Sequence, residues 1–339
     1  MRIKALTIRI IKQFFHDKRT LAMMLVAPLL ILTIISLVFN GEDVVPVIGS
    51  DQLPKPIEDK LKEADVEWEE IKETEYDEAF QEGILDAWVT MVDQQLHITV
   101  EGSDPGMSQR ILSLIQRSLQ SEAGAMKQPE IEYYYGSEDM TSFDNFGPVL
   151  IGFFAFFFVF LIAGVSFLRE RTGGTLERLM ASPVKKYEVV SGYLLGFGFF
   201  TIIQSVLIVF YSIYVLDLLM IGDFLWVLVI TLLCAFTALT LGTLLSAYAQ
   251  NELQMIQFIP IVIVPQVFFS GLFDLEAISD WVSWIGPLTP LYYAADALRD
   301  VMIRGLGFEE IRLNLLVLFG FSLVFSIANM IALRKYRSF

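Results

Sequence analysis

The sequence predicts an α-helical polytopic membrane protein with six transmembrane helices, an N-terminal amphipathic helix and a small extracytoplasmic α/β domain. The main observation is that six long stretches of the 339 residues contain no Asp, Glu, Lys or Arg. A second is that the longest polar interval falls between the first and second stretches. A bilayer core of about 30 Å needs roughly 20 apolar residues in a helix, and a central charge is costly. Six such stretches therefore indicate membrane spans rather than buried helices of a soluble enzyme.

The spans and the polar segments between them divide the chain into eleven parts. Their order is an amphipathic interfacial helix (1–20), span one (21–39), the extracytoplasmic α/β domain (41–144), span two (147–168), a cytoplasmic loop with a short helix (169–188), span three (189–216), span four (224–248), span five (253–273), extracytoplasmic re-entrant and surface helices (274–312), span six (313–333) and a cytoplasmic tail (334–339).

The N-terminal 20 residues interleave apolar and basic side chains at roughly helical spacing. This pattern predicts an amphipathic helix on the inner membrane surface, and a basic retention signal without a defined helix is the alternative. A cleaved secretory signal fits poorly, because no small-x-small site follows the apolar run over 21–39.

Basic residues fix the orientation, because Lys and Arg near membrane ends are retained on the cytoplasmic side. Of the 24 Lys and Arg residues, 14 lie in the N-terminal 20 residues, in the loop between spans two and three and in the C-terminal tail. Both termini are therefore expected inside, and most of the 39 acidic residues outside. This balance implies no nucleic-acid partner. The lack of a cysteine-rich outer domain fits a prokaryotic plasma membrane.

The long interval over 41–144 has its own character, with 25 acidic residues against seven basic ones. Strand-like runs over 44–48, 87–92 and 96–100, a hairpin turning at 93–95, and helical patterns over 54–64 and 108–120 predict a small mixed domain of three to five strands. Its acidity suits a solvated surface better than a cation site, since no EF-hand spacing is present.

Motifs of catalysis are absent from the sequence. It contains no G-x-x-x-x-G-K-[ST] phosphate loop, no G-x-G-x-x-G after a strand and no H-E-x-x-H. His16 and His97 are expected on opposite sides of the membrane, and Cys234 is the single cysteine. We therefore predict no catalytic residue, no metal and no directly bound cofactor. The charge-free spans also disfavour an ion-coupled transporter.

A short helix is predicted in the inner loop, from about Thr175 to Ala181. It places Leu176, Leu179 and Met180 on one face and Glu177 and Arg178 on another. Gly173 and Gly174 precede it, and Pro183 ends it. Such a rigid, two-faced helix suits docking into a partner protein.

This loop resembles that of the ABC-2-type permeases, the membrane subunits of ATP-binding cassette exporters, which carry R-E-x-G-T-L-E-x-L…P. The matching residues are Arg169, Glu170, Gly174, Thr175, Leu176, Glu177, Leu179 and Pro183. An extra residue, Thr172 or Gly173, leaves the register of Glu170 open. The resemblance extends over nearly the whole chain and indicates the subgroup with an enlarged first outer loop.

A second block resembles the family's outer re-entrant segment, P…SG…PLTY…ALR. It comprises Pro265, Ser270, Gly271, Pro287, Leu288, Thr289, Pro290, Leu291, Tyr292, Tyr293, Ala297, Leu298 and Arg299. The family usually has a proline soon after S-G, whereas this chain has Asp274-Leu275-Glu276. Trp281 and Trp284 fit an interfacial aromatic belt, and 294–304 looks like a short surface helix with an Asp300–Arg304 pair.

The resemblance implies one half of an ATP-driven exporter of amphiphilic cargo such as drugs, antibiotics or lipids. Its partners would be an ABC ATPase subunit, which binds ATP and Mg, a second permease chain, identical or paralogous, and membrane lipids.

The implied coupling residues are Glu170, Gly174, Thr175, Leu176, Glu177, Arg178, Leu179, Met180 and Pro183. The implied gating residues are Pro265, Ser270, Gly271, Pro287, Pro290, Tyr292 and Arg299. Glu177→Ala or Leu176→Asp is expected to abolish transport in a folded protein. A secondary transporter or channel, or a membrane-anchored sensor or scaffold, is the alternative.

Within the spans, the pattern gives weaker indications. Possible pathway residues are Phe154, Phe158, Gln204, Gln266 and Asn329, although packing is the commoner role for the phenylalanines. Gly192 and Gly196 form a G-x-x-x-G that allows close helix approach. Pro260 and Pro265 are expected to kink span five, and Gln204, Gln257, Gln266 and Asn329 to bond across helices.

Overall fold

The computed structural model divides the chain into two compact units, and each is described by itself. One unit comprises Met1–Asn40 and Tyr133–Phe339, and the other comprises Gly41–Glu132. The structure describes residues 2–39, 45–50, 53, 55, 66–71, 79–80, 84–92, 95–100, 111–115, 141–272 and 284–332.

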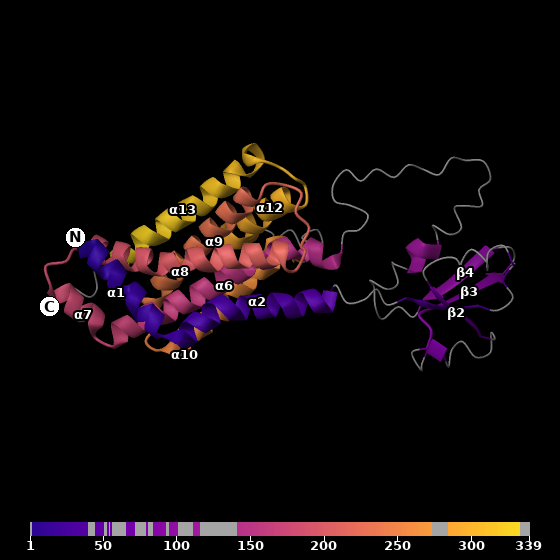
Figure 1. The fold of residues 1–339 in the computed structure, drawn as a ribbon, viewed down its shortest axis with the longest axis horizontal. Helices are drawn as coiled ribbons and strands as arrows, with labels where there is room; N and C mark the ends of the chain where they lie inside the picture. Colours follow the sequence, from indigo (N-terminus) through magenta and orange to yellow (C-terminus); the bar gives the residue numbers. More distant parts are fainter. Residues whose placement is uncertain are drawn as a thin grey trace. The chain divides into compact units, whose positions relative to one another are not determined.

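The first unit is a bundle of helices (Figure 1). Six of the described helices are long and apolar enough to cross a membrane, which confirms the predicted polytopic membrane protein. In chain order the elements are α1 (Arg2–His16), α2 (Lys18–Phe39), α6 (Ser142–Thr172), α7 (Thr175–Ala181), α8 (Lys186–Tyr214), α9 (Phe224–Ser246), α10 (Glu252–Val267), a π-helical segment (Phe268–Leu272), a 3-10 turn (Gly286–Leu288), α12 (Pro290–Met302) and α13 (Phe308–Ala332).

Helix α6 lies at the centre of this unit. In its most apolar window 72% of the residues are buried, against 17% in α13 and 22% in α2. Gly242 brings α9 against the α6 backbone at Phe160, where a Cβ atom would clash with the carbonyl oxygen. Small residues allow such close approach between helices in a membrane. Helices α6 and α9 are therefore in close backbone contact at this point.

Helix α6 is longer than predicted at both ends. It begins at Ser142, inside the domain expected to extend to residue 144, and continues to Thr172, past the expected loop start at residue 169. At the beginning, Thr141 and Asp144 form a capping box, so the charge of Asp144 favours the helix. At the other end, charged residues remain helical because neighbouring helices supply their partners.

The predicted N-terminal helix is present as α1, but it ends at His16 rather than at residue 20, and residues 18–20 belong to α2. Helix α8 explains the position of α1. A Cβ atom at Gly192 would lie 2.7 Å from Leu6, and one at Gly196 would lie 2.7 Å from Ile10. The predicted G-x-x-x-G thus does allow close helix approach, with α1 as the neighbour. Phe14 completes the buried stripe of α1. The opposite flank of α1 carries exposed and half-buried side chains.

The prediction of a surface helix over 294–304 is wrong. Helix α12 begins earlier, at Pro290, and nine of its 13 residues are buried. The expected Asp300–Arg304 pair is present, at 2.6 Å. Helix α10 continues through Pro260 and Pro265 before it passes into the π-helical segment. Residues 273–283, with Trp281 and the Asp274–Glu276 turn, lie outside the described residues.

The second unit contains a four-stranded sheet with the order β2-β1-β3-β4. Strand β1 (Val47–Ser50) is parallel to β2 (Glu67–Glu70) and β3 (Ala87–Val92), and β3 is antiparallel to β4 (Gln95–Val100). The predicted hairpin is confirmed, with Val92 opposite Gln95, although residues 93 and 94 lie outside the described set.

Both faces of this sheet are covered. On β3, Val89 packs in a cluster with Ile111 and Ile115, while Trp88 points to the other face and packs with Leu85. Residues 111–115 are helical, within the predicted helix over 108–120, whereas nearly all of the predicted helix over 54–64 lies outside the described residues. Strand β2 was missed because its sequence, Glu-Trp-Glu-Glu, is too charged to resemble a strand.

Candidate functional site

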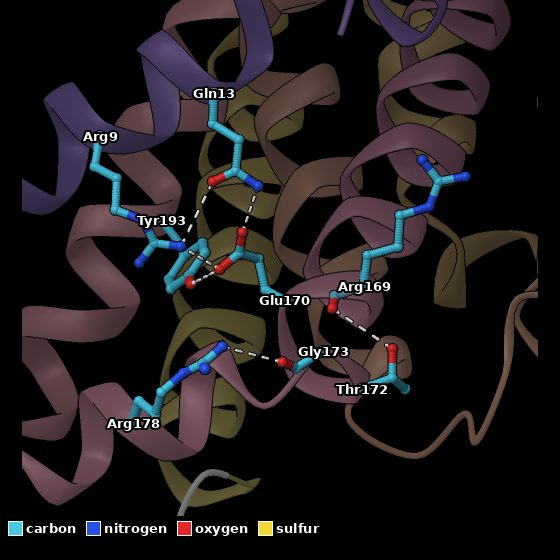
Figure 2. Close-up of polar contacts among 8 residues, drawn as sticks. All are labelled: Arg9, Gln13, Arg169, Glu170, Thr172, Gly173, Arg178 and Tyr193. Carbon is cyan, nitrogen blue, oxygen red and sulfur yellow. Dashed lines mark hydrogen bonds and ion pairs between the residues drawn. The ribbon is translucent and has the colours of Figure 1, made fainter. Parts of the chain in front are cut away.

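The predicted loop helix is confirmed as α7, with the expected bounds Thr175–Ala181. Gly174, at its N-terminus, has φ 71°. This left-handed conformation is readily adopted only by glycine and turns the chain sharply out of α6. The Arg178 guanidinium donates to the Gly173 carbonyl at 3.3 Å, which fixes α7 to the turn that precedes it (Figure 2).

The two faces of α7 differ as predicted. Leu176 and Met180 are buried in the main core of the bundle, Leu179 is half-buried against it, and Glu177 and Arg178 are exposed. The burial of Leu176, 1% exposed, corrects one expectation. An Asp at this position would place an unpaired charge in the core, so Leu176→Asp would disturb folding as well as docking. Glu177 remains available for a partner.

Glu170 lies where three helices meet, and it is 7% exposed (Figure 2). Its carboxylate accepts hydrogen bonds from Arg9 at 2.5 Å and Gln13 at 2.5 Å, both on α1, and from the Tyr193 hydroxyl on α8 at 2.9 Å. Glu170 is therefore not a loop residue facing a partner protein, as the sequence motif suggested. It is a buried anchor that joins α6 to α1 and α8.

Such an anchor is costly to break. Hydrogen bonds to charged groups contribute roughly 1.5–3 kcal/mol each, and removing one partner of a buried pair leaves the other charge uncompensated. The Arg9 side chain is 35% exposed, so water weakens this pair relative to a fully buried one. We name the four residues Arg9, Gln13, Glu170 and Tyr193 the anchor cluster.

Arg169 extends these contacts to α10 and to the α1–α2 junction. Its guanidinium donates to both carboxylate oxygens of Glu252, at 2.7 and 3.2 Å, and lies 3.8 Å from Asp17. The Thr20 hydroxyl and amide donate to the Asp17 carboxylate, which lowers the pKa of Asp17. These pairs are exposed, so their contribution to stability is small, but they define the geometry.

Arg171 connects α6 to the turn after α9. Its guanidinium donates to the Ala247 carbonyl at 2.7 Å and also to the Ala249 carbonyl. With the anchor cluster and Arg169, three consecutive residues of α6 thus contact α1, α8, α10 and the α9–α10 turn. The last helical turns of α6 form the point to which these elements are attached.

The sequence did not single out Arg9, Gln13 or Tyr193 as functional residues. A signal was present, because Arg9 and Gln13 are four residues apart and therefore share one flank of α1. A carboxylate at the end of an apolar span also requires partners. Which helix supplies those partners is decided only by the packing of α1 on α8.

The predicted gating residues come together in part. The Arg299 guanidinium on α12 donates to the Gly271 carbonyl, and Gly271 has φ 78°. Tyr292 packs beside Gly286 rather than beside Gly271. Pro290 is the first residue of α12, Pro287 accepts a hydrogen bond from Tyr293, and Pro265 and Ser270 lie near the end of α10.

The candidate pathway residues are buried by neighbouring helices of the same chain. Phe154 and Phe158 are each 4% exposed. Gln204 donates to the Phe154 carbonyl at 3.5 Å, Gln266 accepts from the Leu291 amide at 3.3 Å, and Asn329 donates to the Thr240 carbonyl at 2.8 Å. These three bond across helices as predicted, whereas Gln257 lies on an exposed face of α10.

Comparison with known proteins shows which family and which proteins this sequence is similar to. The model of the family described as "ABC-2 family transporter protein" matches residues 18–331. The chain is 25% identical over 256 residues to ABC transporter G family member 20 of Dictyostelium discoideum, which covers 75% of this chain and 34% of that protein. It is 21% identical over 177 residues to ABC transporter G family member 23 of the same organism, which covers 52% of this chain and 25% of that protein. The matched region thus spans about a third or less of these relatives.

Proposed function

Since this chain belongs to the ABC-2 family of transporter proteins, we propose that it is the permease of an ATP-driven exporter. Its α7 would receive the movement of an ATP-binding cassette that lies outside these 339 residues. The observation that carries this proposal is the division of α7 into two faces. Leu176 and Met180 fix one face in the core, while Glu177 and Arg178 leave the other face free for a partner.

The orientation of the bundle follows from its charges. Around α7, the described residues of the helical unit include eleven Lys and Arg against five Asp and Glu, and at the opposite end they include three against seven. Basic residues are retained in the cytoplasm. We therefore propose that α7 and both termini lie on the cytoplasmic side of the membrane and that the sheet of the second unit lies outside the cytoplasm.

Coupling would proceed through rigid contacts. A force on Glu177 or Arg178 moves α7 as a whole, because its apolar face is packed in the bundle. The turn at Gly174 passes this movement to the end of α6, and the anchor cluster passes it to α1 and α8. Cores that pack this closely respond to small shifts by moving entire elements rather than by deforming.

The remaining parts of the exporter would lie outside these 339 residues. The cassette would bind ATP and Mg, since the sequence contains no phosphate-binding loop. A second permease chain, identical or paralogous, would complete a pathway between the two chains. The apolar spans favour an amphiphilic cargo such as a drug, an antibiotic or a lipid.

The proposal is tested with the chain and its cassette partner reconstituted together in liposomes. Glu177→Ala is expected to reduce both ATP hydrolysis stimulated by the permease and cargo export at least tenfold, with unchanged insertion and thermal stability. Glu309→Ala is the matched control, because Glu309 is an exposed acid at the opposite end of the bundle. Unchanged export in Glu177→Ala would refute the coupling role. Flux driven by an ion gradient without any ATPase would identify a secondary transporter instead.

A further inference from the structure

An apolar groove runs between α1, α8 and α9, on the side of α1 that faces away from the anchor cluster. Its volume of about 650 Å³ is in the range of small-molecule sites. Thr7 and Ile11 of α1 line one wall, and Phe236 of α9 lies in the other. The α8 wall includes Phe199 and Ile202, which are 40% and 53% exposed, so the groove is open along its side.

The groove is somewhat shorter than one membrane leaflet. Its wall on α8 extends from Leu194 to Ile202, and its wall on α9 from Val229 to Phe236. At 1.5 Å per residue these walls are each about 10–12 Å long, close to half of a hydrocarbon core of about 30 Å. A single acyl chain inserted from one side fits this length, whereas a membrane-spanning helix of a partner would extend well beyond it.

The charges of α1 distinguish its two flanks. Arg9 is paired with Glu170, and Arg2 lies 3.6 Å from Glu188. Within the part of the chain that the structure describes, Lys4 makes no ion pair. The two arginines of this helix are thus paired within the chain, whereas Lys4 and Lys12 pair with no described residue, and of these two lysines Lys4 is the one on the groove side. Helix α1 contains no acidic residue that would oppose it.

Lys4 is an exposed residue on the groove side of α1, although it does not itself line the groove. It is three residues before Thr7 and seven before Ile11, a spacing that places all three on one flank of the helix. The contacts of the α1 residues on either side of Lys4 show which part of α8 lies opposite Lys4. Arg2 contacts Glu188, in the first turn of α8, and Leu6 packs on Gly192. Lys4 therefore lies just beyond the end of the groove, where a lipid phosphate would be.

We infer that this groove binds an anionic phospholipid, with one acyl chain between α1, α8 and α9 and the phosphate at Lys4. Thr7 lines the groove one turn below Lys4, and its hydroxyl donates to the Ile3 carbonyl at 3.0 Å, so its oxygen would serve the lipid only as an acceptor. The bound lipid would hold α1 against α8 on one flank, as the anchor cluster does on the other. The inference does not depend on the proposed cassette, because lipid binding is measured on the chain alone.

Gly198 provides a direct test, because it lines the groove and a Cβ atom added to it would meet no atom within 4 Å. Gly198→Leu places a branched side chain in the groove from an unobstructed Cβ position and introduces a better helix former. Gly320→Leu is the matched control, since Gly320 on α13 also faces open space. Lys4→Gln removes the charge next to the end of the groove, and Lys12→Gln removes the other lysine of the same helix, about two turns further along.

The probes are dioleoyl phosphatidylglycerol and dioleoyl phosphatidylcholine, added to the purified, delipidated full chain and measured by native mass spectrometry. We expect the unmodified protein to bind phosphatidylglycerol preferentially. Lys4→Gln should weaken that binding about fivefold, the effect of one basic residue near an anionic surface, and leave phosphatidylcholine unchanged. Gly198→Leu should weaken both lipids at least tenfold, because several methylene groups lose their site.

Three results would overturn the inference. Equal effects of Lys4→Gln and Lys12→Gln would mean that α1 attracts anionic lipids only through its overall charge. Binding of glycerol phosphate with the affinity of the whole lipid would show that the acyl chain has no role. A change of oligomeric state in Gly198→Leu, with lipid binding intact, would identify the groove as an interface between two copies of the chain.

Discussion

The two ends of the helical unit each carry one short helix, and the two helices are buried to opposite extents. Helix α7 buries two of its seven residues, whereas α12 buries nine of its 13. Each is close to a glycine with positive φ, Gly174 before α7 and Gly271 beside α12. The polar face of α7 remains exposed, with Arg178 bonded only to the neighbouring turn at Gly173 among the described residues, while the guanidinium of Arg299 on α12 reaches a different segment, at the carbonyl of Gly271.

This difference separates two roles that similar sequences can have. A short amphipathic helix whose interior contacts cover only one face leaves the other face for a partner, as in α7. A short amphipathic helix that is buried on most of its surface, such as α12, is part of the packed core of the bundle. The comparison predicts that mutations in α12 affect folding first, and mutations on the exposed face of α7 affect function first.

The largest expected effect is in α12. Leu298→Ala should lower the free energy of unfolding by about 3 kcal/mol, because the side chain is fully buried and its removal leaves a cavity. Leu179→Ala, in α7, should cost less than about 1 kcal/mol, since that side chain is only half-buried. Both are measured by chemical unfolding of the purified chain in detergent. Equal losses would abolish the distinction between the two helices.

The anchor cluster gives the next largest effect. Glu170→Ala removes the acceptor shared by Arg9, Gln13 and Tyr193, and should cost roughly 2–3 kcal/mol. Glu309→Ala removes an exposed pair with Arg312 and should cost about 0.3 kcal/mol. Thermal unfolding of the two variants side by side measures the difference. A stability loss in Glu170→Ala no larger than in Glu309→Ala would show that the cluster does not hold α1 in place.

The two positive-φ glycines sharpen the comparison further. Gly174→Ala should cost about 1–2 kcal/mol, because an alanine is strained at φ 71° although its Cβ would meet no atom within 4 Å. Gly271→Ala should cost more, since its Cβ would also displace the Arg299 guanidinium. Limited proteolysis and thermal unfolding compare the two. A greater loss at Gly174 would mean that the α7 turn is the more constrained of the two.

The sequence predicted α7 more accurately than α12, and the reason is physical. The bounds of α7 were predicted correctly because glycines and a proline surround a seven-residue amphipathic pattern. The burial of α12 was not predicted, because the charged residues Asp296, Arg299 and Asp300 give its sequence the polarity pattern of a surface helix. Asp300 and Arg299 find partners in Arg304 and Gly271, and neither contact leaves a pattern that would indicate burial.

The anchor cluster shows the same limit. The sequence placed Glu170 in a loop because it follows an apolar run and precedes two glycines. In the structure α6 continues for one more turn, and the carboxylate turns toward α1 instead of toward solvent. A helix end is decided by the partners of its last side chains, and those partners are more than 150 residues away or on a separate helix.

The sequence by itself determined the six apolar spans, the amphipathic helix at the N-terminus, the two-faced α7 and the β3–β4 hairpin, because each is a local pattern of polarity with a fixed period. The tertiary structure decided which flank of α1 meets Glu170 and which borders the groove, and that α12 enters the bundle. These features depend on contacts between distant segments. If α1 packed on α8 with a different rotation about its own axis, its other flank would meet Glu170.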